Sequence, residues 1–155
     1  MSEPTTILYK RATFVTRLPV DHRYAPSHAW VARGPEGVWR VGFTKFALRM
    51  LGELVDIQFD RADGDAIRPG DVLGSLEGFK AVSDLFCVGT GIFRGGNPAL
   101  ANDLEALSRD PYATGWLYGF EGIPDERCLD VVGYQALLDA TIDRILAKQQ
   151  AEETP

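Results

Sequence analysis

Short stretches of β-forming residues, several of them alternating between apolar and polar, recur along the chain between turn residues. An alternation with period two is typical of half-buried strands. Residues 5–20 are rich in β-forming residues and are expected to form one extended segment. Further strands are predicted at 38–43, 54–59, 72–76, 82–88 and 116–120.

Apolar residues at helical spacing interrupt this pattern in three places. Thr44 is expected to cap a short helix that ends near Gly52. Asn97 and Pro98 suit the first positions of a second helix. A third, amphipathic helix is predicted over 134–148. The apolar face of the first helix is expected to be core and comprises Phe43, Ala47, Met50, Leu51 and Leu54.

Many short strands, two short helices and a terminal helix predict an α+β domain that is mainly β. The 155 residues fit one domain, and 45% hydrophobic with 25% charged residues is ordinary for a soluble protein. The net charge of −6 argues against a surface that neutralises phosphate, so nucleic-acid binding is not expected. Since no apolar stretch approaches the roughly 20 residues of a membrane span, and no secretory signal is visible, we expect a cytoplasmic protein.

The cysteines and histidines of the chain do not have the spacing of a metal site or of a redox motif. Cys87 and Cys128 have no metal-ligand spacing and are expected to be reduced. A small buried thiol is the simplest role for Cys87, although thiol–disulfide exchange with a nearby group is an alternative. His22 and His28 have no ligand partners at suitable spacing, and His28 is expected to form a structural hydrogen bond beside Trp30.

Lys80 lies where one strand is expected to reverse into the next. Apolar residues lead up to Glu77 and resume at Val82, which predicts a turn between them. A turn at this position presents the primary amine of Lys80 to solvent. The local sequence alone indicates only a solvated lysine in a hairpin turn.

Five short motifs follow one another along roughly residues 23–120. They are Tyr24–Val31, Gly42–Gly52, Glu77–Asp84, Asn97–Leu100 and Asp110–Leu117. In this order they resemble the H protein of the glycine cleavage system, a lipoyl-carrying family. The third motif matches the lipoylation motif Glu-x-x-Lys-Ala-x-Ser-Asp, and five motifs in sequence are far more specific than one.

The resemblance implies a barrel-sandwich hybrid of two antiparallel sheets with Lys80 at a hairpin tip. It implies lipoate bound covalently through Lys80, with Glu77, Asp84, Ser27 and His28 as further cofactor-binding residues. Phe79 and Ala81 replace the methionines that usually flank a biotinyl lysine, which favours a lipoyl group. The resemblance also implies that the protein is a non-catalytic carrier that shuttles an aminomethyl group between separate enzymes. The implied partners are glycine decarboxylase, aminomethyltransferase, dihydrolipoamide dehydrogenase, and a lipoate ligase or lipoyltransferase.

The expected division of the chain is an N-terminal extension (1–22), a carrier domain (23–120), a C-terminal helical segment (121–148) and a frayed tail (149–155). Several positions depart from the family pattern. Ala29 replaces a glutamate that helps line the cleft for the loaded arm, and Gly78-Phe79 replaces a small polar and a β-branched residue. Two alternatives therefore stay open. The arm carries another cargo, such as sulfur or the lipoyl group itself, or the chain is an unmodified interaction module.

Overall fold

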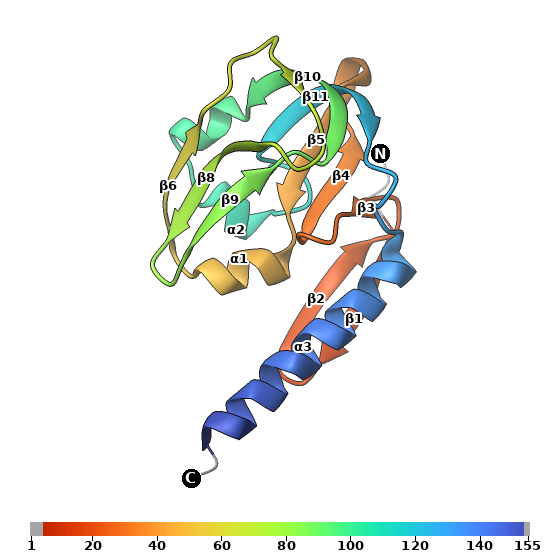
Figure 1. The fold of residues 1–155 in the computed structure, drawn as a ribbon, viewed down its shortest axis with the longest axis vertical. Coiled ribbons are helices and arrows are strands. Elements are labelled where there is room, and N and C mark those ends of the chain that lie inside the picture. Colours follow the sequence, from red (N-terminus) through yellow and green to blue (C-terminus); the bar gives the residue numbers. More distant parts are fainter. Residues whose placement is uncertain (1–4, 154–155) are drawn as a thin grey trace.

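Two antiparallel sheets enclose the main core of the computed structural model, which describes residues 5–153 (Figure 1). The larger sheet has the strand order β3 (Arg23–Tyr24), β4 (Ala29–Arg33), β5 (Trp39–Phe43), β11 (Tyr118–Pro124), β10 (Gly89–Gly96) and β7 (Ala66–Ile67). The smaller sheet has the order β6 (Leu54–Phe59), β8 (Val72–Gly78) and β9 (Val82–Phe86). This architecture confirms the predicted mainly β barrel-sandwich hybrid.

Inward-facing side chains from both sheets make the main core. Leu73, Leu76 and Leu85 of the smaller sheet are almost fully buried. They belong to the same apolar cluster as Val41 and Phe93 of the larger sheet. Short helical segments complete the domain, namely the 3₁₀ turns η1 (Pro35–Gly37) and η2 (Pro98–Ala101) and the helices α1 (Lys45–Leu51) and α2 (Ala106–Arg109).

The N-terminal segment differs from the prediction of one extended piece. It is a hairpin in which β1 (Thr6–Arg11) pairs with β2 (Phe14–Pro19). The chain reverses at Ala12, which has a φ of 53°. Alanine seldom adopts a positive φ, so the composition of this turn did not predict a reversal. The hairpin adds a third, two-stranded sheet. The expected extension also includes residues 1–4, which lie outside the described residues.

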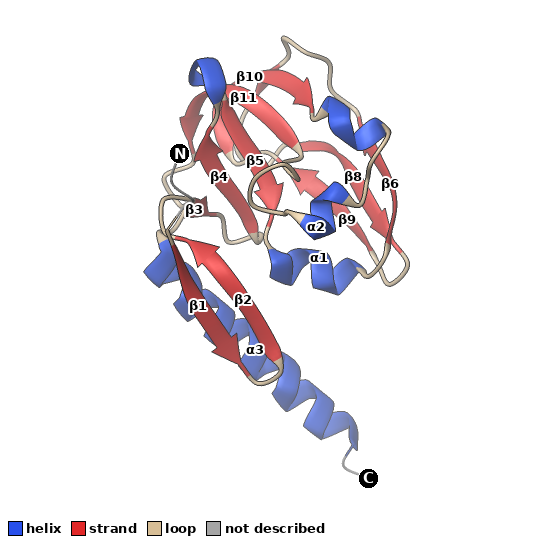
Figure 2. Ribbon diagram, turned by 180° about the vertical axis from the view of Figure 1, so that it is seen from behind, coloured by secondary structure: helices blue, strands red, loops and turns tan. Residues whose placement is uncertain are grey.

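The C-terminal helix α3 (Val131–Glu153) packs along this hairpin, and its first turns also contact β3 of the larger sheet, where Tyr134 stacks on Tyr24 (Figures 1 and 2). Tyr134, Leu138 and Ile142 of α3 form a second apolar cluster with residues of β1 and β2. The helix continues five residues beyond Lys148, so the expectation that the tail frays from residue 149 is wrong over 149–153. Glutamine, alanine and glutamate in these positions favour a helix, which accounts for the extension.

Helix α1 forms where it was predicted, but its buried face is different. The Thr44 side chain accepts a hydrogen bond from the Ala47 amide, and Gly52 follows the last turn. Phe46, Leu48 and Leu51 are buried, whereas Met50 is 50% exposed. Because α1 contacts both the main core and the second cluster, it joins the two parts of the molecule.

None of the helices within residues 5–153 combines the length and hydropathy that crossing a bilayer requires. Both cysteines are free thiols and both are buried. No group of three or more metal-binding side chains comes together in this part of the chain.

Candidate functional site

Lys80 lies at the tip of the hairpin formed by β8 and β9, as the sequence predicted. The last strand pair in register is Glu77 with Val82, and the Gly78 amide donates a hydrogen bond to the Ala81 carbonyl at 2.9 Å. The Lys80 side chain is exposed. Its ammonium forms no ion pair or hydrogen bond with any of residues 5–153. The amine is therefore accessible to a modifying enzyme.

The backbone of the hairpin tip is held by the segment that follows α1. The Lys80 amide donates to the Leu51 carbonyl at 2.9 Å, and the Phe79 amide donates to the Glu53 carbonyl at 2.9 Å. These bonds satisfy two turn amides that face away from the ladder between β8 and β9. Residue 80 therefore has a fixed backbone position although its side chain is exposed.

Gly52 and Gly78 allow this close approach of the hairpin to α1. A Cβ on Gly52 would lie 2.9 Å from Lys80 Cγ, and Gly52 has a φ of 75°. A Cβ on Gly78 would lie 2.2 Å from the Leu51 carbonyl oxygen. Both distances are too short for real contacts, so the hairpin docks here because neither residue has a side chain. This gives a structural reason for Gly78, one of the departures from the family pattern.

The outer face of the smaller sheet is acidic beside this tip. Antiparallel partners point to the same face of a sheet, and Glu77 pairs with both Asp56 and Val82. Two positions further along, Asp84 pairs with Ser75. Three exposed carboxylates therefore share one face next to Lys80. Glu77 and Asp84 lie where a protein that docks on the hairpin would meet them.

Two apolar side chains flank the same tip in solvent. Phe79 is 76% exposed and Val82 is 65% exposed, which is unusual for large apolar residues. They stand on either side of Lys80 and Ala81. The tip thus presents an apolar contact beside the acidic face.

Ser27 is placed away from the lysine. It lines a small pocket of about 200 Å³ together with Phe86, Cys87 and the ion-paired Asp125 and Arg127. Phe86 is six residues from Lys80 along the hairpin, which corresponds to about 20 Å at the rise of a strand. Ser27 and Lys80 are therefore at opposite ends of β9.

Cys87 fits the structural role expected for it. Burial raises the pKa of its thiol to about 11, and the thiol donates to the Gly89 carbonyl at 3.0 Å. A thiol in this state is a poor nucleophile for disulfide exchange. The geometry therefore favours the small buried hydrophobe over the alternative of exchange with a dithiolane.

His28 forms the expected structural hydrogen bond, but with a different neighbour. Its Nδ1 is 2.9 Å from the Tyr134 hydroxyl, which is also 2.8 Å from the Thr44 hydroxyl. The imidazole beside Trp30 is that of His22, at a centroid distance of 4.9 Å. Burial lowers the pKa of His28 to about 4, so the ring is neutral near pH 7. This chain of bonds ties α3 to the start of α1.

Ala29 is buried in β4, opposite Phe43, and 3% of it is exposed. A carboxylate at this position would have to leave the apolar core to reach solvent. The β4 position at which the resemblance implies a cleft glutamate therefore has no carboxylate in this chain.

Gly52 is a neighbour of Lys80 that the sequence did not predict. Its position suited a helix terminator, but the two residues are 28 positions apart and neither shares a motif with the other. The contact follows from docking of the hairpin on α1, which no local pattern reports. Glycine immediately after a short helix was the one available signal.

These features define a small barrel-sandwich domain that displays one unpaired lysine on a docked hairpin. The sequence model of the "Glycine cleavage H-protein" family matches residues 22–136. A glycine cleavage system H protein from Kocuria rhizophila is 36% identical over 129 residues, which cover 81% of this chain and 100% of that protein. Its counterpart from Listeria monocytogenes is 34% identical over 125 residues, covering 79% and 98%.

A solved structure shows the same fold. The crystal structure of a glycine cleavage system H protein from Mycobacterium marinum aligns with a TM-score of 0.69 and 33% sequence identity. The alignment covers 77% of this chain and 97% of that one. The chain belongs to the glycine cleavage H-protein family.

Proposed function

We propose that this chain is a non-catalytic carrier with a lipoyl group attached through an amide to Lys80. The observation that supports this most directly is the tip of the β8–β9 hairpin. Its lysine is exposed and unpaired within the described residues, while its backbone is fixed to Leu51. A fixed root and a free amine suit an arm that must visit several enzymes, because a tether raises the effective concentration of the group at its end.

The surroundings of Lys80 suit recognition by a lipoate ligase or lipoyltransferase. Glu77 and Asp84 supply charge beside the tip, and Phe79 supplies an apolar contact. In amide formation the neutral amine attacks an activated lipoyl carbonyl, the activating group leaves, and the amine loses a proton. The cation is thereby replaced by a neutral amide.

Intact mass measurement of the protein from lipoate-supplemented cells tests the attachment. We expect the mass of one lipoyl group on the wild type and on Lys10→Arg, a control at another exposed lysine. Lys80→Arg should have the mass of the bare polypeptide. A bare wild-type mass would instead support the unmodified interaction module, and an adduct on Lys80→Arg would place the arm elsewhere.

For the cargo we propose an aminomethyl group, received from glycine decarboxylase and passed to an aminomethyltransferase, with dihydrolipoamide dehydrogenase reoxidising the arm. Glycine-dependent reduction of the lipoyl protein by glycine decarboxylase measures the first step. No reduction of a fully lipoylated sample would refute this cargo. Ser27 and His28 remain proposed contacts of the arm, and the variants Ser27→Ala and His28→Asn each test one of them in the same assay.

A different cargo is the second candidate, because Ala29 is buried where the family has a cleft glutamate. An ammonium group sheltered from water requires an anionic partner. If the arm carries sulfur or a lipoyl group in transit, glycine decarboxylase will leave it oxidised.

A further inference from the structure

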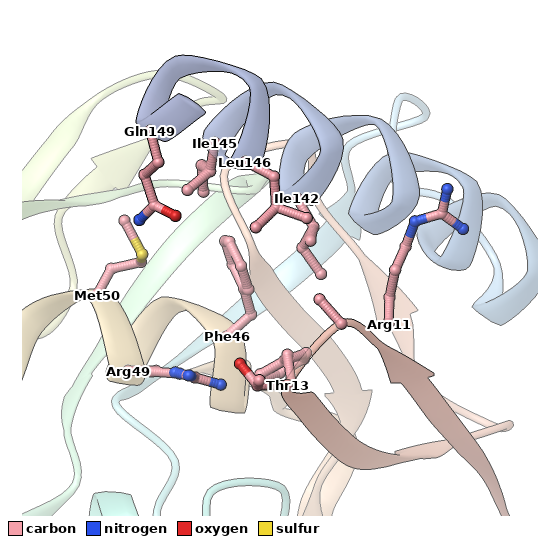
Figure 3. Close-up of a pocket in the computed structure, with 11 residues that line it drawn as sticks. Arg11, Thr13, Phe46, Arg49, Met50, Ile142, Ile145, Leu146 and Gln149 are labelled. Carbon is pink, nitrogen blue, oxygen red and sulfur yellow. The ribbon is translucent and has the colours of Figure 1, made fainter. Parts of the chain in front are cut away.

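A second pocket lies next to the helix end that holds Lys80. It has a volume of about 250 Å³ and lies between α1, the turn of the β1–β2 hairpin and the later turns of α3. Figure 3 shows Phe46 in the middle of this space, pointing from α1 toward Ile142 and Ile145 of α3. Met50 and Leu146 stand at its rim and are 50% and 40% exposed. The pocket is therefore apolar and open to solvent.

Much of this pocket is made by segments outside the family match. The match spans residues 22–136, whereas β1, β2 and the lining residues of α3 lie before or after it. Helix α1 is the wall that belongs to the matched region. The pocket thus arises where two additional segments meet a helix of the family domain.

Lys80 lies against the end of α1, the helix that forms this wall of the pocket. The Lys80 amide donates a hydrogen bond to the Leu51 carbonyl, and Lys80 Cγ would lie 2.9 Å from a Cβ on Gly52. The side chain therefore passes over the end of α1, two residues beyond Met50. Along the helix axis the distance from Gly52 back to Phe46 is about 9 Å at the rise of an α-helix. A lipoyl arm extends about 10 Å beyond Cγ before its ring, at roughly 1.2 Å per bond of an extended chain.

The charges around the pocket favour an arm that ends in a neutral ring over an arm that ends in an ammonium group. Its lining contains no aspartate or glutamate among the described residues. Arg11 is held by Asp143 at 2.8 Å, and Arg49 lies over the Phe14 ring at 5.5 Å without a carboxylate partner in residues 5–153. An ammonium group would meet unpaired positive charge here. A neutral ring would meet the flexible apolar side chain of Met50 and the ring of Phe46, and sulfur makes favourable contacts with aromatic rings.

We propose that this pocket holds the neutral, oxidised dithiolane end of the arm on Lys80 while the arm is unloaded. The inference rests on the proposed attachment of a lipoyl group. Because the arm is tethered close to the pocket, its effective concentration there is high, and a small apolar pocket is enough to bind it. An arm that bears a cationic load leaves the pocket, so the site distinguishes the resting arm from the loaded one.

The test measures how fast an anionic water-soluble phosphine reduces the dithiolane, with samples quenched by alkylation and weighed intact. The variant Met50→Glu/Leu146→Glu introduces two carboxylates at exposed rim positions. The control Ile123→Glu/Val132→Glu adds the same charge at apolar positions that are 74% and 67% exposed and do not line the pocket. All samples are first shown by mass to be lipoylated.

We expect reduction of the rim variant to be about tenfold faster than that of the wild type, the size expected when a few methylene groups return to water. The control should match the wild type or be slower, because added negative charge repels the reagent. Equal rates in the rim variant and the control would overturn the pocket while leaving the lipoyl attachment intact. A bare wild-type mass would instead refute the proposed function.

Isotope-edited NMR of the wild type tests whether the arm occupies the pocket without the use of a rim variant. The methyl resonances of Ile142 and Ile145 should shift on lipoylation and return when the arm is loaded with an aminomethyl group. Resonances that are identical in the bare and lipoyl proteins would overturn the proposal.

Discussion

Replacing Gly52 by alanine should destabilise the protein through the docking of the Lys80 hairpin. Gly52 has φ 75° and ψ −157°, a region that residues with a Cβ rarely enter. Occupying it with alanine costs about 1–3 kcal/mol. The new Cβ would also displace the Lys80 side chain from its place 2.9 Å away. For a chain of this size, about 2 kcal/mol lowers the melting temperature by roughly 4–8 °C.

Thermal and urea unfolding of Gly52→Ala measure this loss, and Gly37→Ala is the matched control. Gly37 has a φ of 76°, but a Cβ added there would have no atom within 4 Å, so its variant reports the cost of alanine at a similar positive φ without the contact. A double-mutant cycle with Lys80→Ala isolates the contact itself, for which we expect a coupling of about 0.5–1 kcal/mol. If Gly52→Ala is no less stable than Gly37→Ala and shows no coupling to Lys80, the close docking of the hairpin on α1 does not depend on this glycine.

Three further predictions concern the contacts of α3. Tyr134→Phe should lower the free energy of unfolding in urea by about 1–3 kcal/mol, because it leaves the buried Thr44 hydroxyl and the His28 ring without their shared partner. An unchanged midpoint would show that these hydrogen bonds do not stabilise the protein. The low pKa of His28, about 4 against 6.5 in the unfolded chain, means that the unfolded state binds a proton first as the pH falls. Stability should therefore decrease from pH 6.5 toward pH 4 by at most about 3 kcal/mol, and His28→Asn should flatten the curve between pH 6.5 and 5, before the carboxylates titrate. Arg11→Ala should lower the melting temperature slightly in dilute buffer and leave it unchanged in high salt, since the pair with Asp143 is exposed; a loss that persists in high salt would point to packing of the arginine stem.

Local chemistry was enough to predict the elements around the site. Thr44 caps α1 through its hydroxyl, and Asn97 caps the next helical segment by accepting from the Ala99 amide. The Lys80 turn was placed correctly because Glu77 and Val82 bound it on either side. In each case the signal lies within a few residues of the feature that it predicts.

Features that depend on distant packing were not predictable in this way. Met50 has helical spacing with buried residues, yet it is half exposed because α3 leaves a pocket beside it. The second helical segment is only a 3₁₀ turn followed by one short helix, although Asn97 and Pro98 suited a longer one. Ala12 gave no sign of a turn, since its positive φ is stabilised by the pairing of β1 and β2.

The contacts between β1 and α3 join residues that are very far apart in the chain. Tyr9 donates to Asp139 across 130 positions, and Arg11 to Asp143 across 132. During synthesis the β1–β2 hairpin therefore emerges from the ribosome well before the helix that covers it. The apolar face of Phe14 and Leu18 is not covered by α3 during that period, and apolar surface that is exposed for a time favours aggregation.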